Sequence, residues 1–597
     1  MMAHDRLDRR VNERRQAMRR AAKWAIALGT TAVVAGVSSV FALRSVREAN
    51  LNPNAPLANV PGPQGAYTPI SALQPVVPKN ARIDHYTLTA ESRTLTVGGH
   101  ALQAMTFNGT APGPLLVAHQ GDVVKVTVHN RLSVPLTIHW HGIAVPGAED
   151  GVPGVTQNPI PPGGSYTYEF QVNQPGTYWY HSHEASFEEV GLGLYGAFVV
   201  LPKRAVHPAD RDYTLVLHEW PTASTAQTMM ANLKAGNLGF SAKGESAGMG
   251  GMGMQQNGDM NGMGMMGAAD GTGQGGNSAS DIAHVLPGPP LQLNGFSPTA
   301  NDWAALDEMA GMYDAFTVNQ NASGTTLLPA KPGQLVRLRI VNSGNMTHLF
   351  TLVGAPFRVV ALDGHDIANP GWIRGVLLPV GAAERYDIEF RVPKSGAAFL
   401  VCADPDTTAQ RELRAAIGLP DAWSQFKETD AASLERAPWF DFTHYGSGRL
   451  PGEAVFRLHQ AYQVRYNMKL TVGMSMNGMV YAINGKVFPN IPPIVVRKGD
   501  AVLVHIVNDS PYIHPMHLHG HDFQVLTRDG KPVSGSPIFL DTLDVFPGES
   551  YDIAFRADNP GLWMFHCHDL EHAAAGMDVM VQYAGIRDPY PMSEMSE

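Results

Sequence analysis

The sequence predicts an all-β protein of three Greek-key β-sandwich domains, because two kinds of segment each recur three times. Alternation of apolar and polar residues is typical of a half-buried strand. Such a strand recurs as VVKVTVHN (123–130), LVRLRIVN (335–342) and AVLVHIVN (501–508). A turn with Pro and Gly leads into a second strand after each copy, at 161–170, 379–390 and 546–555. Each repeat exceeds about a hundred residues, which favours one sandwich per repeat.

Composition fits several packed domains and excludes one class of partner. The chain has 597 residues, of which 44% are hydrophobic and 8% aromatic, enough for several cores. The net charge of −10 argues against nucleic acid binding. The chain has two cysteines, Cys402 and Cys567, and no intramolecular disulfide can form if Cys567 binds a metal.

The N-terminal segment 1–49 predicts export. Residues 1–23 contain eight Arg or Lys against three acidic residues, and the uncharged stretch Trp24–Leu43 is just long enough to span a bilayer. The basic flank should stay in the cytoplasm and leave the remaining chain outside it. Arg19 and Arg20 also resemble a twin-arginine export signal. A retained membrane anchor and a cleaved signal both fit, because no clear A-x-A cleavage site is present.

The remaining chain divides into a linker and three domains. Residues 50–79 are rich in Pro, Asn and Ala and read as the linker. The predicted domains are 80–205, 206–450 and 451–583.

The second domain contains a Met-rich insertion at about 240–285. Within it, segment 248–267 carries seven methionines among Gly, Asn and Gln: Met249, Met252, Met254, Met260, Met263, Met265 and Met266. This composition predicts a flexible loop. Thioether sulfur is a soft donor suited to Cu(I), so one interpretation is capture of cuprous ions. The alternative is a low-complexity insertion with oxidisable methionines and no binding role.

Soft and imidazole donors near the C-terminus indicate copper. His566, Cys567 and His568 are followed by His572 and Met577. Two His, one Cys and a weak axial Met form the donor set of a blue copper site. On a strand, His566 and His568 would face one way and Cys567 the other. One strand would then serve two metal sites, with Cys567 joining them.

Paired histidines predict the second metal site. With 24 His in 597 residues, chance gives about one His-x-His pair. Five pairs are present, at 139/141, 181/183, 517/519, 519/521 and 566/568. Isolated residues such as His85, His207 and His284 are expected to be ordinary core or surface histidines.

These histidine motifs resemble, in content and order, those of the multicopper oxidases, the family of laccases, ascorbate oxidase and bacterial cuprous oxidases. The motifs are HWHG, HSH, HPMHLHGH and HCH. The resemblance covers roughly residues 80–583 and implies cupredoxin domains with four coppers per chain: one type 1, one type 2 and a type 3 pair. It implies these type 1 ligands: His514, Cys567, His572 and, axially, Met577. The implied type 2 ligands are His139 and His517. The implied type 3 ligands are His141, His181, His183, His519, His566 and His568.

The resemblance implies further roles for three acidic residues. Asp150 matches an acidic residue that delivers protons. In some relatives another carboxylate, just after the second type 1 histidine, belongs to the proton route. This chain has Ala573 at that position, so Glu571 would have to substitute for it. Asp541 matches a carboxylate that helps bind substrate Cu(I) near the type 1 histidine, and an exposed loop acid is the alternative.

His521 lies outside the ligand pattern and is expected to support the metal ligands.

The second repeat keeps part of a type 1 spacing. His348 lies six residues after Asn342, and Cys402 six after Gly396. The third repeat has the same offsets from Asn508 to His514 and from Gly561 to Cys567. Thr407 and Glu412 replace the other two ligands. We interpret this as a decayed type 1 site and not a fifth copper. The alternative is a buried thiol that packs as a small hydrophobe.

The repeat also predicts where the coppers lie and how they act. Two pairs of implied ligand histidines fall in the first domain and two in the third, which places a trinuclear cluster between them and makes the second domain a spacer. The implied reaction couples one-electron oxidation at the type 1 copper to four-electron reduction of dioxygen to water.

Three functions fit this pattern. The first is a periplasmic or otherwise extracytoplasmic cuprous oxidase in copper tolerance, with laccase activity on the side. The second is a laccase for phenols or aromatic amines. The third is a copper-binding protein without turnover, against which the complete ligand set argues. Met577 at the axial position favours a low to moderate potential.

Overall fold

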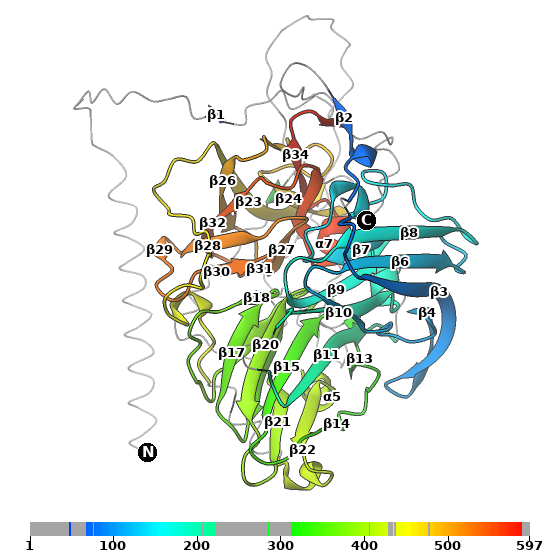
Figure 1. Ribbon diagram of the computed structural model, residues 1–597, viewed down its shortest axis with the longest axis vertical. Coiled ribbons are helices and arrows are strands. Elements are labelled where there is room, and N and C mark those ends of the chain that lie inside the picture. Colours follow the sequence, from blue (N-terminus) through cyan, green and yellow to red (C-terminus); the bar gives the residue numbers. More distant parts are fainter. Residues whose placement is uncertain are drawn as a thin grey trace, which may run out of the picture. The chain divides into compact units, whose positions relative to one another are not determined.

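The computed structural model in Figure 1 describes residues 47–48, 67–75, 77–204, 208–222, 228, 284–285, 312–404, 406–427, 434, 437–475 and 478–587. Within these ranges, no helix is both long enough and apolar enough to pass through a lipid bilayer. The predicted export stretch Trp24–Leu43 and the Met-rich segment 248–267 lie outside the described residues.

The first unit is a pair of four-stranded sheets. One has the order β4 (His100–Phe107), β3 (Ile83–Val97), β6 (Val123–Asn130) and β8 (Ser165–Gln171). The other has the order β5 (Leu116–His119), β10 (Tyr195–Leu201), β9 (Gly176–Ser182) and β7 (Ile138–His141). The apolar core between these sheets includes Trp140, Tyr168 and Phe198.

The second unit repeats the two-sheet arrangement. Its six-stranded sheet has the order β13 (Ala315–Val318), β11 (Arg211–Trp220), β15 (Leu335–Asn342), β20 (Arg385–Arg391), β17 (Phe357–Leu362) and β18 (His365–Asp366). Its five-stranded sheet has the order β14 (Thr326–Pro329), β22 (Arg414–Gly418), β21 (Ala397–Cys402), β16 (His348–Val353) and β19 (Leu378–Val380).

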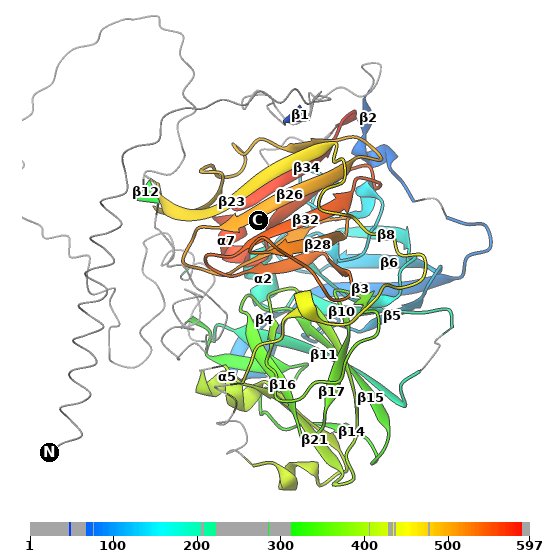
Figure 2. The ribbon, with the colours of Figure 1, turned by 90° about the vertical axis from the view of Figure 1, so that its left-hand side faces the viewer.

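The third unit has the largest sheet, in which Figure 2 shows β23, β26, β32 and β28 side by side. Its order is β1 (Arg47–Glu48), β23 (Val464–Ser475), β26 (Ala501–Asn508), β32 (Ser550–Arg556), β28 (Phe523–Arg528) and β29 (Lys531–Pro532). Side pairings add β12 (His284–Val285), β24 (Gly478–Ile483) and β30 (Ile538–Leu540). The facing sheet has the order β25 (Ile494–Val496), β34 (Asp578–Tyr583), β33 (Leu562–Cys567), β27 (His514–Leu518) and β31 (Thr542–Val545).

Short elements complete the described chain. A two-stranded sheet joins β2 (Thr68–Pro69) to β35 (Ile586–Arg587). The α-helices are α2 (Ser186–Gly191), α5 (Thr407–Glu412) and α7 (Leu570–Ala574). The 3₁₀ turns are η3 (Ile70–Ala72), η4 (Gly147–Glu149), η6 (Ala422–Gln425) and η8 (Phe442–His444). The largest apolar core contains residues of all three units, among them Trp179, Leu338 and Trp563, so apolar contacts continue from one sandwich to the next, while the first unit also has a core of its own.

The predicted all-β fold and its repeat are confirmed. The three alternating segments form β6, β15 and β26 with the predicted bounds, and each pairs antiparallel with the predicted second strand, β8, β20 or β32. Each also pairs in parallel with the strand on its other side, β3, β11 or β23.

A buried asparagine ends each repeated strand and fixes the loop that follows. The Asn508 side-chain amide donates to the Tyr512 and Val545 carbonyls at 2.7 and 2.8 Å, and its oxygen accepts from the Ser510 amide at 2.9 Å. Asn130 and Asn342 make the same three bonds. Because these bonds satisfy buried backbone groups, they set the position at which the next strand begins. In the third unit that strand is β27, which begins at His514.

Candidate metal centres

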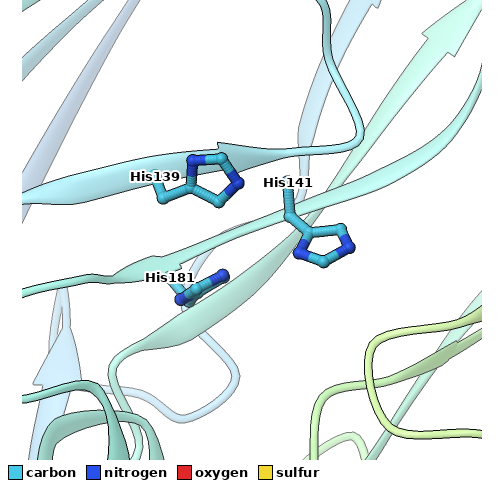
Figure 3. A group of neighbouring side chains, drawn as sticks. All are labelled: His139, His141 and His181. Atoms are coloured by element: carbon cyan, nitrogen blue, oxygen red, sulfur yellow. The ribbon is translucent and has the colours of Figure 1, made fainter. Parts of the chain in front are cut away.

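Four cluster histidines come from two neighbouring strands of the first unit. His139 and His141 lie on β7, with one residue between them, so both point to the same face. His181 lies on β9 directly opposite His139, and His183 follows the end of β9. Figure 3 shows the rings of His139, His141 and His181 gathered around a common space, and each offers a donor nitrogen within 4.8 Å of the other two.

The third unit supplies four more histidines. His517 on β27 pairs with His566 on β33, while His519 and His568 follow the ends of these strands. The Nε2 atoms of His519 and His566 are 3.1 Å apart, and His183 completes a three-nitrogen group with them. The ring of His139 stacks on His519 at 3.8 Å, and His141 stacks on His517 at 3.7 Å. Histidines of the two units therefore interleave.

We call these eight residues the histidine cluster: His139, His141, His181, His183, His517, His519, His566 and His568. Each is at most 2% exposed.

One ring nitrogen of most cluster histidines is held by the protein, which turns the other toward the cluster. Nδ1 of His139, His181, His517 and His566 lies 2.8–3.0 Å from a backbone carbonyl oxygen. The buried Nε2 atoms of His139, His181 and His517 have no hydrogen-bond partner among the described residues. Metal-bound histidines are oriented in this way, so the donor set fits copper ions.

Burial keeps five of the cluster imidazoles neutral, as metal ligands must be. Burial, followed by the nearby His139, lowers the pKa of His183 to about 3. Burial and neighbouring rings also hold the pKa values of His141, His181, His519 and His566 well below the ordinary range. One nitrogen lone pair of each of these five rings is therefore available at physiological pH.

Asp150 lies behind two cluster histidines from different units. Its Oδ2 is 3.0 Å from His519 Nδ1, and its Oδ1 is 3.2 Å from His139 Nδ1. The side chain is fully buried. This position places a carboxyl group directly beside the histidine cluster.

Asp541 does not lie where its expected role requires. Its Oδ1 is 3.2 Å from His141 Nε2 and 3.4 Å from His517 Nδ1, so it lies beside the histidine cluster. Both of its oxygens accept from Arg385, at 2.7 and 2.5 Å. Burial raises the pKa of Asp541, but Arg385 outweighs burial and holds it well below the ordinary value. The prediction that Asp541 binds substrate Cu(I) is therefore wrong, because its oxygens are enclosed and already paired; it is not an exposed loop acid either.

Arg385 is the site residue that the sequence interpretation missed. It lies on β20 of the second unit, is fully buried, and also contacts Asp363 at 3.3 Å and the Thr177 carbonyl at 3.1 Å. The aligned first and third repeats carry Ser165 and Ser550 at this position. An arginine that replaces serine in only one repeat is a signal by which the sequence could have identified Arg385 as a site residue. The description of the second unit as a spacer is incomplete, since it supplies this cation to the cluster.

The predicted type 1 residues converge at the end of β33. Cys567 Sγ lies 3.6 Å from His514 Nδ1 and 3.4 Å from His572 Nδ1, and the two nitrogens are 3.0 Å apart. Such separations suit donors that share one ion at about 2.0–2.3 Å. The buried Met577 is tied to the site through its backbone: its carbonyl accepts from Cys567 N and its amide donates to His572 O, both at 3.0 Å.

The surroundings orient both predicted type 1 histidines. His514 Nε2 is 2.7 Å from Ser510 Oγ, and His572 Nε2 is 3.4 Å from Asp569 Oδ2. The ring of Tyr481 stacks on His572 at 3.9 Å. Burial, then His572, holds the pKa of His514 well below its ordinary range, so this ring is also neutral.

Two further expectations concern residues near the cluster. His521 hydrogen-bonds Tyr583 OH at 2.7 Å and the His519 carbonyl at 3.1 Å, which is a supporting position as expected. Glu571 is fully buried and accepts from Tyr313 OH at 2.9 Å.

Comparison with known proteins points the same way as this geometry. Two family models described as multicopper oxidase match residues 89–205 and 456–585. The multicopper oxidase MmcO of Mycobacterium tuberculosis is 30% identical over 560 residues, covering 92% of this chain and 95% of the relative. A copper resistance protein A homolog of Pseudomonas syringae pv. tomato is 26% identical, covering 82% and 91% of the two chains. The crystal structure of a multi-copper oxidase from Pseudomonas thermotolerans is similar with a TM-score of 0.57 and 26% identity, over 85% of this chain and 100% of that one.

Proposed function

Because this chain belongs to the multicopper oxidase family, we propose that its type 1 copper is bound by His514, Cys567, His572 and, axially, Met577. We further propose that the histidine cluster holds the type 2 copper through His139 and His517 and the type 3 pair through the other six histidines. The chain is an oxidoreductase that uses copper ions as cofactors and dioxygen as electron acceptor.

One observation carries the ligand assignment: Cys567 Sγ meets two imidazoles while His566, the preceding residue of β33, meets the histidine cluster. The test is to load the protein with copper, record the absorption of the oxidised form at about 600 nm, and follow oxygen consumption with a reductant. An absent band or absent oxygen consumption would refute the assignment.

When bound, the copper ions would store single electrons from the substrate and pass four of them to dioxygen. The chain's own residues provide the connection and exclude water. Cys567 and His566 are joined by one peptide bond, and His566 Nδ1 also donates to the Cys567 carbonyl at 2.8 Å. Because these residues are buried, the path between the sites is short and dry.

Asp150 is proposed to hold the proton that dioxygen reduction consumes. Asp150→Asn keeps the shape but removes the titrating group, so reoxidation of the reduced protein by dioxygen should slow about 100-fold. Anaerobic reduction of the 600 nm band by substrate should be unchanged, because it precedes the proton step. Stopped-flow absorption separates the two phases. Equal slowing of both phases would argue for a purely structural role of Asp150.

Cu(I) is the proposed substrate, and export through segment 1–49 to an extracytoplasmic or periplasmic location is proposed with it. The soft methionine donors of 248–267 support this substrate, as does similarity to a protein named for copper resistance. The alternative substrates are phenols or aromatic amines.

Deleting residues 248–267 distinguishes these substrates. If the loop captures Cu(I), the deletion should lower kcat/KM for Cu(I) about tenfold and leave oxidation of a small phenol unchanged, as measured by oxygen uptake. A variant with all seven methionines changed to Leu keeps the loop length and should behave like the deletion, since only the thioethers are lost. Unchanged Cu(I) oxidation in both variants would show that the loop has no capture role.

A further inference from the structure

The second unit keeps the frame of a type 1 site. His348 begins β16 as His514 begins β27, and Cys402 ends β21 as Cys567 ends β33. The strand register is also the same, since each cysteine pairs with the residue two positions after its histidine. The two sites therefore occupy equivalent places in their sandwiches.

A buried ion triad replaces the metal ligands in the second unit. His348 Nδ1 lies 2.6 Å from Asp404 Oδ2, and Nε2 lies 2.8 Å from Glu219 Oε1. A ring with a carboxylate at each nitrogen must donate from both, so His348 is an imidazolium. Burial lowers the pKa of His348, but Asp404 and Glu219 outweigh it and raise the pKa to about 10. A fixed cation thus stands where the third unit would bind copper.

A chain of hydrogen bonds leads from this triad to the third unit. Glu219 accepts from the backbone amides of Asn345 and Met346, both at 3.1 Å. The Asn345 side-chain amide donates to Tyr313 OH at 2.8 Å, and Tyr313 OH donates to Glu571 Oε1 at 2.9 Å. All of these residues are buried.

The chain ends on the helix that carries a type 1 ligand. Glu571 precedes His572 in α7, which has only five residues, too few to be stable without tertiary contacts. Burial raises the pKa of the Tyr313 phenol well above its ordinary value, so it stays a donor at all physiological pH values. The Tyr313–Glu571 hydrogen bond therefore joins the second unit to α7 over the whole physiological pH range.

We infer that Tyr313, held in place by the His348 triad through Asn345, is a positioning residue for the type 1 copper site. Tyr313 acts on His572 through Glu571 and α7. The residues that replace a type 1 site in the second unit therefore help to fix the position of a copper ligand in the third unit. This inference rests on the proposed type 1 ligands.

Tyr313→Phe tests it, because the change removes one hydroxyl and keeps the ring. Loss of a group that orients a metal ligand costs roughly 10–100-fold in metal affinity. We expect release of type 1 copper to a chelator, followed as decay of the 600 nm band, to accelerate at least about tenfold. The band should also shift in position or intensity at full copper loading. Tyr445→Phe is the matched control: this Tyr is also in the second unit, and its hydroxyl bonds the Gly371 carbonyl and the Val359 amide, away from α7.

Variants of Glu571 separate loss of the Tyr313–Glu571 hydrogen bond from general damage. Glu571→Gln keeps an acceptor for Tyr313 and should retain the wild-type band and release rate. Glu571→Leu should accelerate copper release at least as much as Tyr313→Phe, because it also removes the hydrogen bond between Glu571 and Asp569. The double variant Tyr313→Phe/Glu571→Leu should be no worse than Glu571→Leu alone. If the wild type has a normal band and both Tyr313→Phe and Glu571→Leu behave like Tyr445→Phe, the positioning role of Tyr313 is refuted. The assignment of the type 1 ligands would still stand. A copper-loaded wild type without the band would instead refute the ligand assignment on which it rests.

Discussion

Replacing Cys567 with Ser is expected to abolish the absorption band at about 600 nm and to reduce substrate-dependent oxygen consumption by roughly a thousandfold or more. The band and the electron path both need a thiolate. A serine hydroxyl stays protonated at neutral pH and is a hard donor that binds copper weakly at a trigonal site. The histidine cluster does not use this side chain, so its copper should remain.

Copper analysis and spectroscopy check this expectation together. Cys567→Ser should lose one copper per chain, and the buried rings of His514 and His572 should remain in place. Cys402→Ser is the matched control, because Cys402 is equally buried and ends the equivalent strand of the second unit. Burial raises the pKa of the Cys402 thiol well above its ordinary value, so it is not a thiolate, and its replacement should leave band and copper content unchanged. Loss of a copper from Cys402→Ser would instead reveal a metal site in the second unit.

The repeated strands and the donor residues were predictable because both follow local rules. Alternation with a period of two predicted β6, β15 and β26 at their observed bounds. The same alternation predicted that Cys567 and His566 would serve different sites. Short spacing between donors, as in His139 and His141, is visible in sequence for the same reason.

Partners from distant segments were not predictable. Arg385 meets Asp541 across 156 positions, and His348 meets Glu219 across 129. No local pattern marks either pair, since each depends on how whole sandwiches pack. Spacing revealed the decayed site at His348 and Cys402 but not the carboxylates that now occupy it. Matching Asp541 to a substrate ligand failed because its surroundings are set by the second unit.

Arg385→Met is expected to lower the free energy of unfolding by about 3–5 kcal/mol, because it leaves buried carboxylates without their cation. Asp541 and Asp363 both face Arg385, at 2.5 and 3.3 Å. Burial raises the pKa of Asp363 to about 7, with Arg385 opposing the rise, so this carboxyl is only partly charged near neutral pH. Asp541 therefore supplies most of the uncompensated charge in the variant.

The loss should depend on pH in a defined direction. In the wild type, the pKa of Asp541 lies below its unfolded value of about 3.9, so its ionised form stabilises the fold above that pH, and the contribution disappears as the pH falls through lower values. Without Arg385, burial raises the pKa instead, and ionisation opposes folding. The difference between the two proteins should thus be largest near neutral pH and shrink below about pH 4. Urea unfolding at several pH values measures it.

Arg339→Met separates loss of stability from loss of site geometry. Arg339 is also buried in the second unit, pairs with Asp212 and Asp387 at 2.8 and 3.0 Å, and shares Thr177 as a neighbour with Arg385. Within the described part of the chain, the side chains of these partners make no hydrogen bond or ion pair with a cluster histidine, so this variant should lose stability but keep normal reoxidation by dioxygen. Arg385→Met should lose both, because Asp541 orients His141 and His517 from behind. Normal reoxidation kinetics in folded Arg385→Met would show that the second unit contributes packing only, and that the cluster histidines keep their orientation without the Asp541 ion pair.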